Sequence, residues 1–100
     1  MIDFCIITVT YNSSAYMQYF IDSINKTAEK QAFHLFISDN NSNDFGEIKS
    51  ICKEATNITL IESNNNYGFC KGNNIAVQEA IKLNPKYILF INPDLFLTTA

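Results

Sequence analysis

The chain has 100 residues, which is enough for one small domain. Hydrophobic residues make up 47% and charged residues 17%, as in ordinary globular proteins. The net charge of −3 and the lack of a basic run exclude nucleic-acid binding through phosphate neutralisation.

The cysteines and the first residues indicate the compartment. Cys5, Cys52 and Cys70 form no CxxC pair and are odd in number, so we expect free thiols in a reducing compartment, mostly as small core side chains. Asp3 stands where a secretory signal would be basic, and no apolar run approaches the roughly 20 residues of a membrane helix. The sequence therefore predicts a cytoplasmic chain.

Strand and helix signals alternate from the first residues onward. Residues 4–9 form a near-continuous apolar run, typical of a strand covered on both faces. Ser13 or Ser14 can cap a following helix. The expected apolar stripe of that helix recurs every four residues, at Tyr16, Phe20, Ile24 and Ala28.

The middle of the chain repeats this order. Residues 33–38 read as a second strand, and Asp44 with Glu47 resembles a capping box at the start of a second helix. The apolar positions of that helix follow at i, i+3, i+4 and i+7: Ile48, Ile51, Cys52 and Ala55.

The last part of the chain supplies two more strands and a helix. We expect strands at residues 58–61 and 87–91, and between them a helix that ends at Asn84-Pro85, because proline disfavours helical geometry in the preceding residue. The order βαβαβαβ predicts a single α/β unit over residues 1–100: a mostly parallel sheet with helices on both faces.

Polar residues follow each expected strand, at residues 10–12, 39–42, 62–66 and 92–94. In a parallel sheet these clusters share the carboxyl edge, where open α/β sheets bind ligands. Asn, Asp and Ser are also common turn formers, so each cluster taken alone has a purely structural explanation.

The segment at residues 66–74 opens the third helix and contains Gly68, Lys71 and Gly72. Glycines permit close backbone approach, and amides at a helix N-terminus favour anions. The stretch by itself fits a phosphate-binding loop and a plain turn about equally.

Four motifs carry a resemblance to a known family: VTYN, SDNNSND, NNNYGFCKGNN and ILFINPD, each at the end of an expected strand or the start of the third helix. In this order and spacing the chain resembles the family 2 glycosyltransferases of the GT-A fold. It is closest to the branch of bacterial rhamnosyltransferases and galactofuranosyltransferases. The resemblance covers the N-terminal nucleotide-sugar-binding part only; the acceptor-binding part is absent.

The resemblance implies roles for residues at the first two strand ends. Thr10, Tyr11 and Asn12 would line the base pocket, with Tyr11 as a ring face for the base or, alternatively, as a partly exposed loop residue. Asp39 would accept a hydrogen bond from the imide N–H of uracil or thymine, which suits an acceptor-only carboxylate. Its alternative role is to cap the turn that follows.

The resemblance also implies a diphosphate and metal site. Lys71 corresponds to a basic position near the diphosphate, and Gly68 and Gly72 would shape its loop. Asp94 would bind Mg²⁺ or Mn²⁺ against the diphosphate. It belongs to a variant of the family's Asp-x-Asp element in which Asn92 replaces the first Asp. Asn92 is expected to contact the nucleotide-sugar. The alternative for Asp94 is a turn residue after a proline.

The implied activity is inverting transfer of a sugar from a UDP- or dTDP-sugar to an acceptor hydroxyl, in cell-surface polysaccharide or glycoconjugate synthesis. The acceptor would be a saccharide or a lipid-linked molecule, and a full-length parent would act in the cytoplasm or at the inner face of the membrane. No catalytic residue is expected here, because the family's base follows the metal motif.

The sequence supports four further expectations. A non-catalytic nucleotide-binding or interaction module is the alternative function. A nucleotidyltransferase is disfavoured, because the first loop lacks a Gly-rich basic run. The apolar tail at Leu95, Phe96 and Leu97 predicts self-association. His34, the only histidine, is expected to be a surface or partly buried structural residue.

Overall fold

The computed structural model describes residues 2–28, 30–66 and 68–93. Strands and helices alternate as the sequence predicts. In chain order they are β1 (Phe4–Thr10), α1 (Ser14–Thr27), β2 (Phe33–Asp39), α2 (Phe45–Cys52), β3 (Ile58–Glu62), α3 (Gly68–Ile81) and β4 (Tyr87–Phe90).

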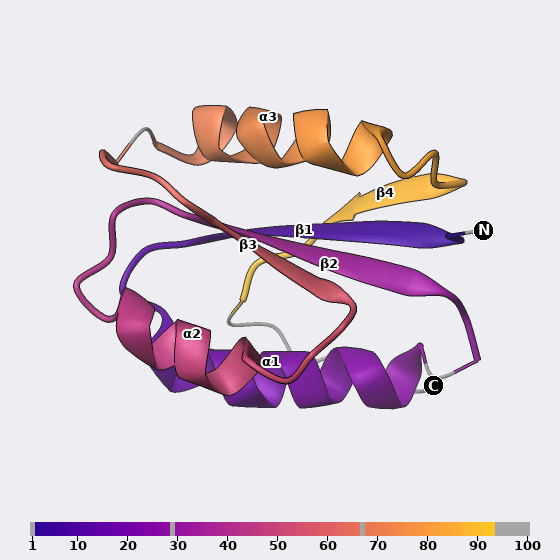
Figure 1. Ribbon diagram of the computed structural model, residues 1–100, viewed down its shortest axis with the longest axis horizontal. Helices are drawn as coiled ribbons and strands as arrows, with labels where there is room; N and C mark the ends of the chain where they lie inside the picture. The colour runs from indigo at the N-terminus through magenta and orange to yellow at the C-terminus, as the bar shows by residue number, and fades with distance from the viewer. Residues whose placement is uncertain (1, 29, 67, 94–100) are drawn as a thin grey trace.

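The strands form one parallel sheet in the order β3-β2-β1-β4, as seen in Figure 1. Phe4 of β1 lies in register with Phe33 of β2 on one side and with Tyr87 of β4 on the other. The expected parallel α/β architecture is confirmed.

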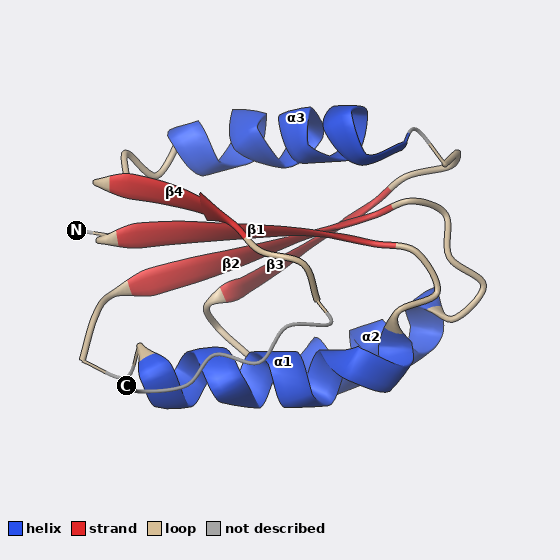
Figure 2. Ribbon diagram, turned by 180° about the vertical axis from the view of Figure 1, so that it is seen from behind, coloured by secondary structure: helices blue, strands red, loops and turns tan. Residues whose placement is uncertain are grey.

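Helices cover both faces of the sheet. In Figures 1 and 2, α1 and α2 lie on one face and α3 lies on the other. Each face has its own apolar cluster because side chains alternate along the strands. On the α1–α2 face the buried cluster comprises Ile6, Met17, Phe20, Ile21, Ile24, Leu35, Ile37, Ile48 and Cys52, and on the α3 face Cys5, Ile7, Phe36, Ala76 and Ala80.

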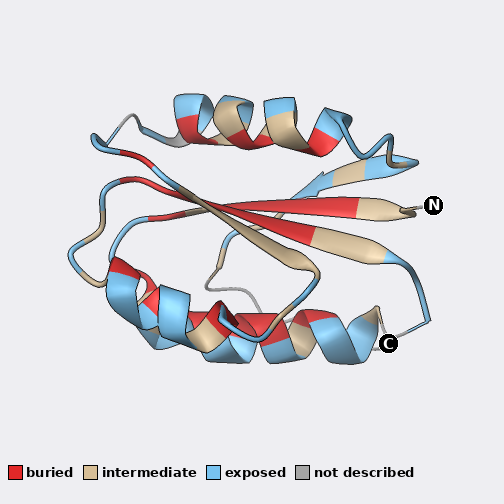
Figure 3. Cartoon of the chain, in the orientation of Figure 1, coloured by how far each residue is buried: buried red, intermediate tan, exposed pale blue. Residues whose placement is uncertain are grey.

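Burial is greatest in the two central strands (Figure 3). β1 and β2 are covered from both sides, which agrees with their near-continuous apolar sequences. β4 is bonded to β1 alone among the described strands, and three of its four residues are exposed: Tyr87, Leu89 and Phe90.

The first helix buries a different stripe from the predicted one. Tyr16 is 52% exposed, while Met17 and Ile21 join Phe20 and Ile24 in the core. A strict four-residue repeat drifts around a helix of 3.6 residues per turn, so its first member rotates out of the core. Ala28, the last predicted member, is the C-cap residue.

The second helix begins without the predicted capping box. Asp44 is the N-cap residue but makes no side-chain cap bond. Its Oδ2 accepts from the backbone N–H of Ser14 at 2.9 Å, and Glu47 Oε2 accepts from the Ser14 hydroxyl at 2.7 Å. Both carboxylates therefore join α2 to the start of α1. The helix ends at Cys52, so Ala55 lies beyond it.

The cysteines divide by position. Cys5 and Cys52 are buried, as expected, and burial raises the pKa of both thiols. Cys70 is exposed on α3, so its expected place in the core is wrong. No helix in the described part of the chain is long and apolar enough to cross a membrane.

Candidate functional site

The carboxyl edge of the sheet contains a topological switch point between β1 and β4. The chain runs from β1 to β2 to β3 in one direction, and α3 then leads back so that β4 pairs with the other side of β1. Loops at such a point diverge and leave a crevice, which is where open α/β sheets bind ligands. Tyr11, Asn12 and Asn92 follow the two strands that flank it.

Thr10 and Asp39 are the last residues of β1 and β2, paired in register, rather than loop residues as expected. Asp39 is 0% exposed and its oxygens accept three hydrogen bonds. Oδ1 accepts from Thr10 Oγ1 at 2.6 Å and from Ser42 Oγ at 2.7 Å, and Oδ2 accepts from the Ser42 backbone N–H at 2.8 Å. The carboxylate thus caps its turn, the alternative that the sequence left open. Direct contact with a base stays a prediction.

Further bonds tie the loop after β1 to the loop after β2. The backbone N–H of Asn12 donates to Ser42 Oγ at 2.7 Å, and the backbone N–H of Asn43 donates to Asn12 Oδ1 at 2.9 Å. Asn12 has a φ of 53° and Asn41 a φ of 61°, left-handed conformations that asparagine tolerates better than most residues. Tyr11, beside these ties, is 53% exposed.

Asn40 is a site residue that sequence reasoning missed. It is buried, and its Nδ2 donates to the carbonyl of Gly68 at 3.2 Å, which joins β2 to the start of α3. Its Oδ1 has no hydrogen-bond partner among the described residues, and neither has Oδ1 of Asn73 on α3. Strand alternation was the available signal, because it places Asn40 on the opposite face from Asp39.

The start of α3 lies at the same edge, on the other face of the sheet (Figure 2). Gly68 has a φ of 82°, and its N–H donates to Asn66 Oδ1 at 2.9 Å. A Cβ at Gly72 would lie 3.1 Å from each γ-carbon of Val9, so this glycine lets the helix pack closely on β1. Lys71 is exposed in the first turns, where the helix dipole also favours an anion.

The predicted metal residue, Asp94, lies outside the described residues, as does the apolar tail at 95–97. Asn92 is exposed just after β4, next to Ile91, whose backbone N–H bonds Ile7 of β1 at 3.0 Å. The described residues contain no group of three or more carboxylate, histidine or cysteine side chains arranged to hold a metal ion. The predicted Mg²⁺ or Mn²⁺ site therefore depends on Asp94.

A hollow of about 390 Å³ lies beside this edge, between α3 and β4. Cys70, Asn73, Asn74 and Phe90 line it. It combines an apolar ring with amide groups and adjoins the α3 N-terminus. The edge as a whole can therefore offer hydrogen-bond acceptors, an aromatic face and a positive helix end to a polar, anionic ligand.

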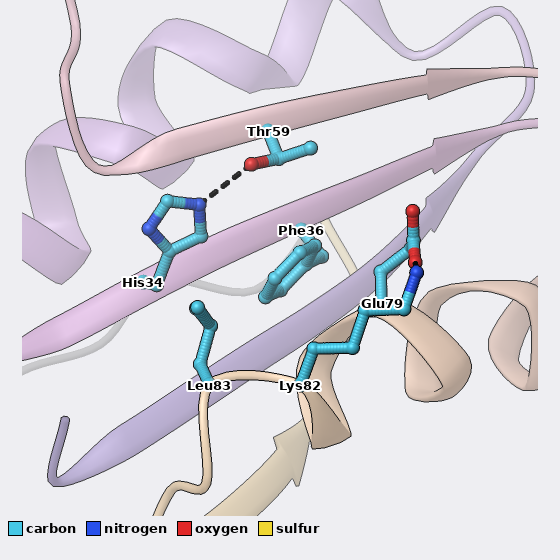
Figure 4. A pocket seen from close by; sticks show the side chains of 6 residues that line it. All are labelled: His34, Phe36, Thr59, Glu79, Lys82 and Leu83. Carbon is cyan, nitrogen blue, oxygen red and sulfur yellow. Dashed lines mark hydrogen bonds and ion pairs between the residues drawn. The ribbon is translucent and has the colours of Figure 1, made fainter.

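A second hollow, of about 240 Å³, lies towards the other end of the sheet (Figure 4). His34 contacts Thr59 there, with 2.6 Å between Nε2 and Oγ1, and Lys82 pairs with Glu79 at its rim. Burial lowers the pKa of His34. These polar groups bond in two pairs, and His34 is partly buried, one of the two expected positions.

Comparison with known proteins agrees with this geometry. A family model described as "Glycosyl transferase family 2" matches residues 5–100. The fold is similar to the crystal structure of S. aureus TarS 1-349, with a TM-score of 0.75 and 25% identity over 93% of this chain and 28% of that one. A second structure of S. aureus TarS gives a TM-score of 0.74 and 24% identity over 93% of this chain and 17% of that one. The chain thus spans less than a third of these structures. No curated protein matches the sequence.

Proposed function

The chain belongs to glycosyl transferase family 2, and from this premise we propose that the carboxyl edge of its sheet binds the nucleotide of a UDP- or dTDP-sugar. The observation that carries the proposal is the convergence of the β1, β2 and α3 termini at the β1–β4 switch point. Ligands of open α/β sheets bind at such a point.

The base is proposed to lie between Tyr11 and the end of β2. The half-exposed Tyr11 offers a ring face for stacking. Asn40 Oδ1, an acceptor with no partner among the described residues, suits the imide N–H that uracil and thymine share. Asp39 supports this pocket through its hydrogen bonds with Thr10 and Ser42, and its direct contact with the base stays a prediction.

The diphosphate is proposed to lie toward the N-terminus of α3. Lys71 and the positive end of the helix dipole favour its charge there, and Asn92 faces it from the end of β4. Asp94 is the proposed ligand of Mg²⁺ or Mn²⁺, hard cations that take carboxylate and phosphate oxygens. When bound, the ion would stabilise negative charge on the leaving diphosphate.

The proposed reaction of a longer protein that contains this chain is sugar transfer with inversion. The acceptor hydroxyl oxygen bonds to the anomeric carbon as the bond from that carbon to the diphosphate oxygen breaks, and the nucleoside diphosphate leaves with the electron pair. The hydroxyl proton passes to a base that this chain is not expected to supply. A saccharide or lipid-linked acceptor, and a role in cell-surface polysaccharide synthesis as in the rhamnosyl- and galactofuranosyltransferase branch, belong to the same proposal.

Calorimetric titration of the chain with UDP and dTDP, with and without Mn²⁺, tests the donor site. Asn40→Ala should weaken binding about tenfold in both conditions, because one buried acceptor is lost. Asp94→Ala should remove only the part that depends on Mn²⁺. Asn25→Ala, on the exposed side of α1, is the matched control and should bind as the wild type does. A folded chain that binds neither nucleotide would contradict the proposal.

A further inference from the structure

One of the side chains that join the loops after β1 and β2 makes two hydrogen bonds itself. The Ser42 hydroxyl donates to Asp39 Oδ1 at 2.7 Å and accepts from the backbone N–H of Asn12 at 2.7 Å. The chain of bonds therefore runs from a fully buried carboxylate, through one hydroxyl, to the loop that contains Tyr11. Bonds that share a hydroxyl in this way strengthen one another.

The buried end of this chain of bonds is fixed. Asp39 belongs to β2, it is 0% exposed, and Thr10 Oγ1 of β1 donates to it at 2.6 Å. The Ser42 backbone N–H donates to its other oxygen at 2.8 Å. The position of the Ser42 hydroxyl is thus set by the sheet rather than by the exposed loop.

The exposed end is held by two bonds to Asn12, which has a φ of 53°. The backbone N–H of Asn43 donates to Oδ1 of Asn12 at 2.9 Å. The Ser42 hydroxyl bonds the N–H of Asn12, and Tyr11 directly precedes Asn12 with 53% of its surface exposed. Because Tyr11 is the chain neighbour of Asn12, a shift of the Asn12 backbone changes where the Tyr11 ring lies.

We propose that Ser42 is a positioning residue of the nucleotide site. Its hydroxyl holds Asn12 at a fixed place relative to the buried Asp39 and so directs the Tyr11 ring toward the base. The inference rests on the proposed function, since it assumes that a base stacks on Tyr11. Ser42 itself touches no ligand in this account.

Ser14 supplies a matched control, because its hydroxyl makes a nearby bond that joins the start of α1 to α2. It donates to Glu47 Oε2 at 2.7 Å, but this bond reaches the start of α1 rather than the residue beside Tyr11. Ser14 and Ser42 are both half-buried, so replacing either by alanine removes one hydroxyl of similar exposure. In Ser42→Ala, Asp39 keeps its bonds from Thr10 and from the Ser42 backbone, so the chain should fold.

The experiment measures UDP affinity and amide hydrogen exchange for Ser42→Ala, Ser42→Thr and Ser14→Ala. We expect Ser42→Ala to weaken UDP binding about tenfold and to speed exchange at the Asn12 amide, which has lost its acceptor. Ser42→Thr keeps the hydroxyl and should restore both values. Ser14→Ala should change neither.

The outcomes separate this inference from the proposed function. Equal loss of UDP affinity in the two alanine variants, or no restoration by Ser42→Thr, would reduce Ser42 to a general structural role and overturn the inference. UDP binding by the wild type that Ser42→Ala leaves unchanged would overturn it while the proposed function stands. If the wild type binds no UDP, the proposed function fails and with it the ligand part of the inference. Unchanged Asn12 exchange in Ser42→Ala would then overturn the structural part.

Discussion

The two ends of the sheet use their polar side chains differently. At the amino end they satisfy one another: His34 contacts Thr59, Lys82 pairs with Glu79, and Asp3 Oδ2 accepts from the Ala32 backbone N–H at 3.1 Å. That last bond is the main reason why the pKa of Asp3 lies below its ordinary value. The polar groups of these residues are therefore satisfied by contacts within the protein.

The carboxyl end combines hydrogen-bonded side chains such as Asp39 and Ser42 with buried oxygens that have no partner among the described residues. Among the described residues, five buried side-chain oxygens have no hydrogen-bond partner, and they belong to Thr8, Ser38, Asn40, Asp44 and Asn73. All five lie near the ends of β1 and β2, at the start of α2 or in the first half of α3. Buried polar atoms without partners are costly, so their concentration at one edge indicates a place kept for a ligand or for water.

The largest expected effect comes from the buried carboxylate at the carboxyl end. Asp39→Ala leaves the donors of Thr10 and Ser42 without their acceptor and should lower the free energy of unfolding by about 3 kcal/mol. Urea unfolding measures this change. Asp22→Ala is the control, because Asp22 accepts from Gln18 in an exposed pair, and it should change stability by less than about 0.5 kcal/mol. Similar changes in the free energy of unfolding for the two variants would mean that the buried Asp39 and its hydrogen bonds contribute little to stability.

A pair of glycine substitutions gives the next largest effect. Nothing lies within 4 Å of a Cβ at Gly46, so Gly46→Ala in α2 should raise the free energy of unfolding by about 0.5–1 kcal/mol. Gly72→Ala should lower it by about 1 kcal/mol, because the new methyl meets both γ-carbons of Val9 at 3.1 Å and pushes α3 off β1. If urea unfolding shows that both variants are stabilised to the same extent, then α3 and β1 have room for a methyl group at position 72, and the account of Gly72 is contradicted.

The smallest effect concerns His34 at the amino end. Because burial lowers its pKa below the ordinary 6.5, the unfolded chain binds this proton more readily than the folded chain. Its contribution to stability is therefore complete above about pH 6.5 and falls as the pH drops toward the folded-state pKa. His34→Gln should reduce the difference between urea midpoints at about pH 7.5 and about pH 5.5. If the urea midpoints of His34→Gln differ between the two pH values as much as those of the wild type, His34 is not the cause of the pH dependence.

Much of the fold follows from the sequence because its signals are local. Apolar runs such as residues 4–9 act within a few residues, so the number, type and order of the elements are confirmed. The third helix ends at Ile81, three residues before the predicted stop at Asn84-Pro85. The burial of Tyr16 was wrong because residues spaced by four do not stay on one face along the helix.

The candidate site was harder to predict, since its contacts join residues far apart in the chain. Glu47 was assigned to a local capping box, but it bonds Ser14, 33 residues earlier. Whether a strand-end carboxylate points into the sheet or toward a ligand depends on register, which pairs Asp39 with Thr10 and leaves Asn40 on the other face. The family resemblance assigned the candidate site residues to this edge but carried no information about these bonds.

The most direct test of the account is to follow the backbone amide NMR signals of the chain while UDP is added. The proposed site predicts the largest shifts at Tyr11, Asn12, Asn40 and Gly68, with the amides of His34 and Thr59 unchanged at the opposite end. Shifts centred on His34 and Thr59, or no shifts at all in the folded chain, would contradict the claim that the carboxyl edge is the nucleotide site.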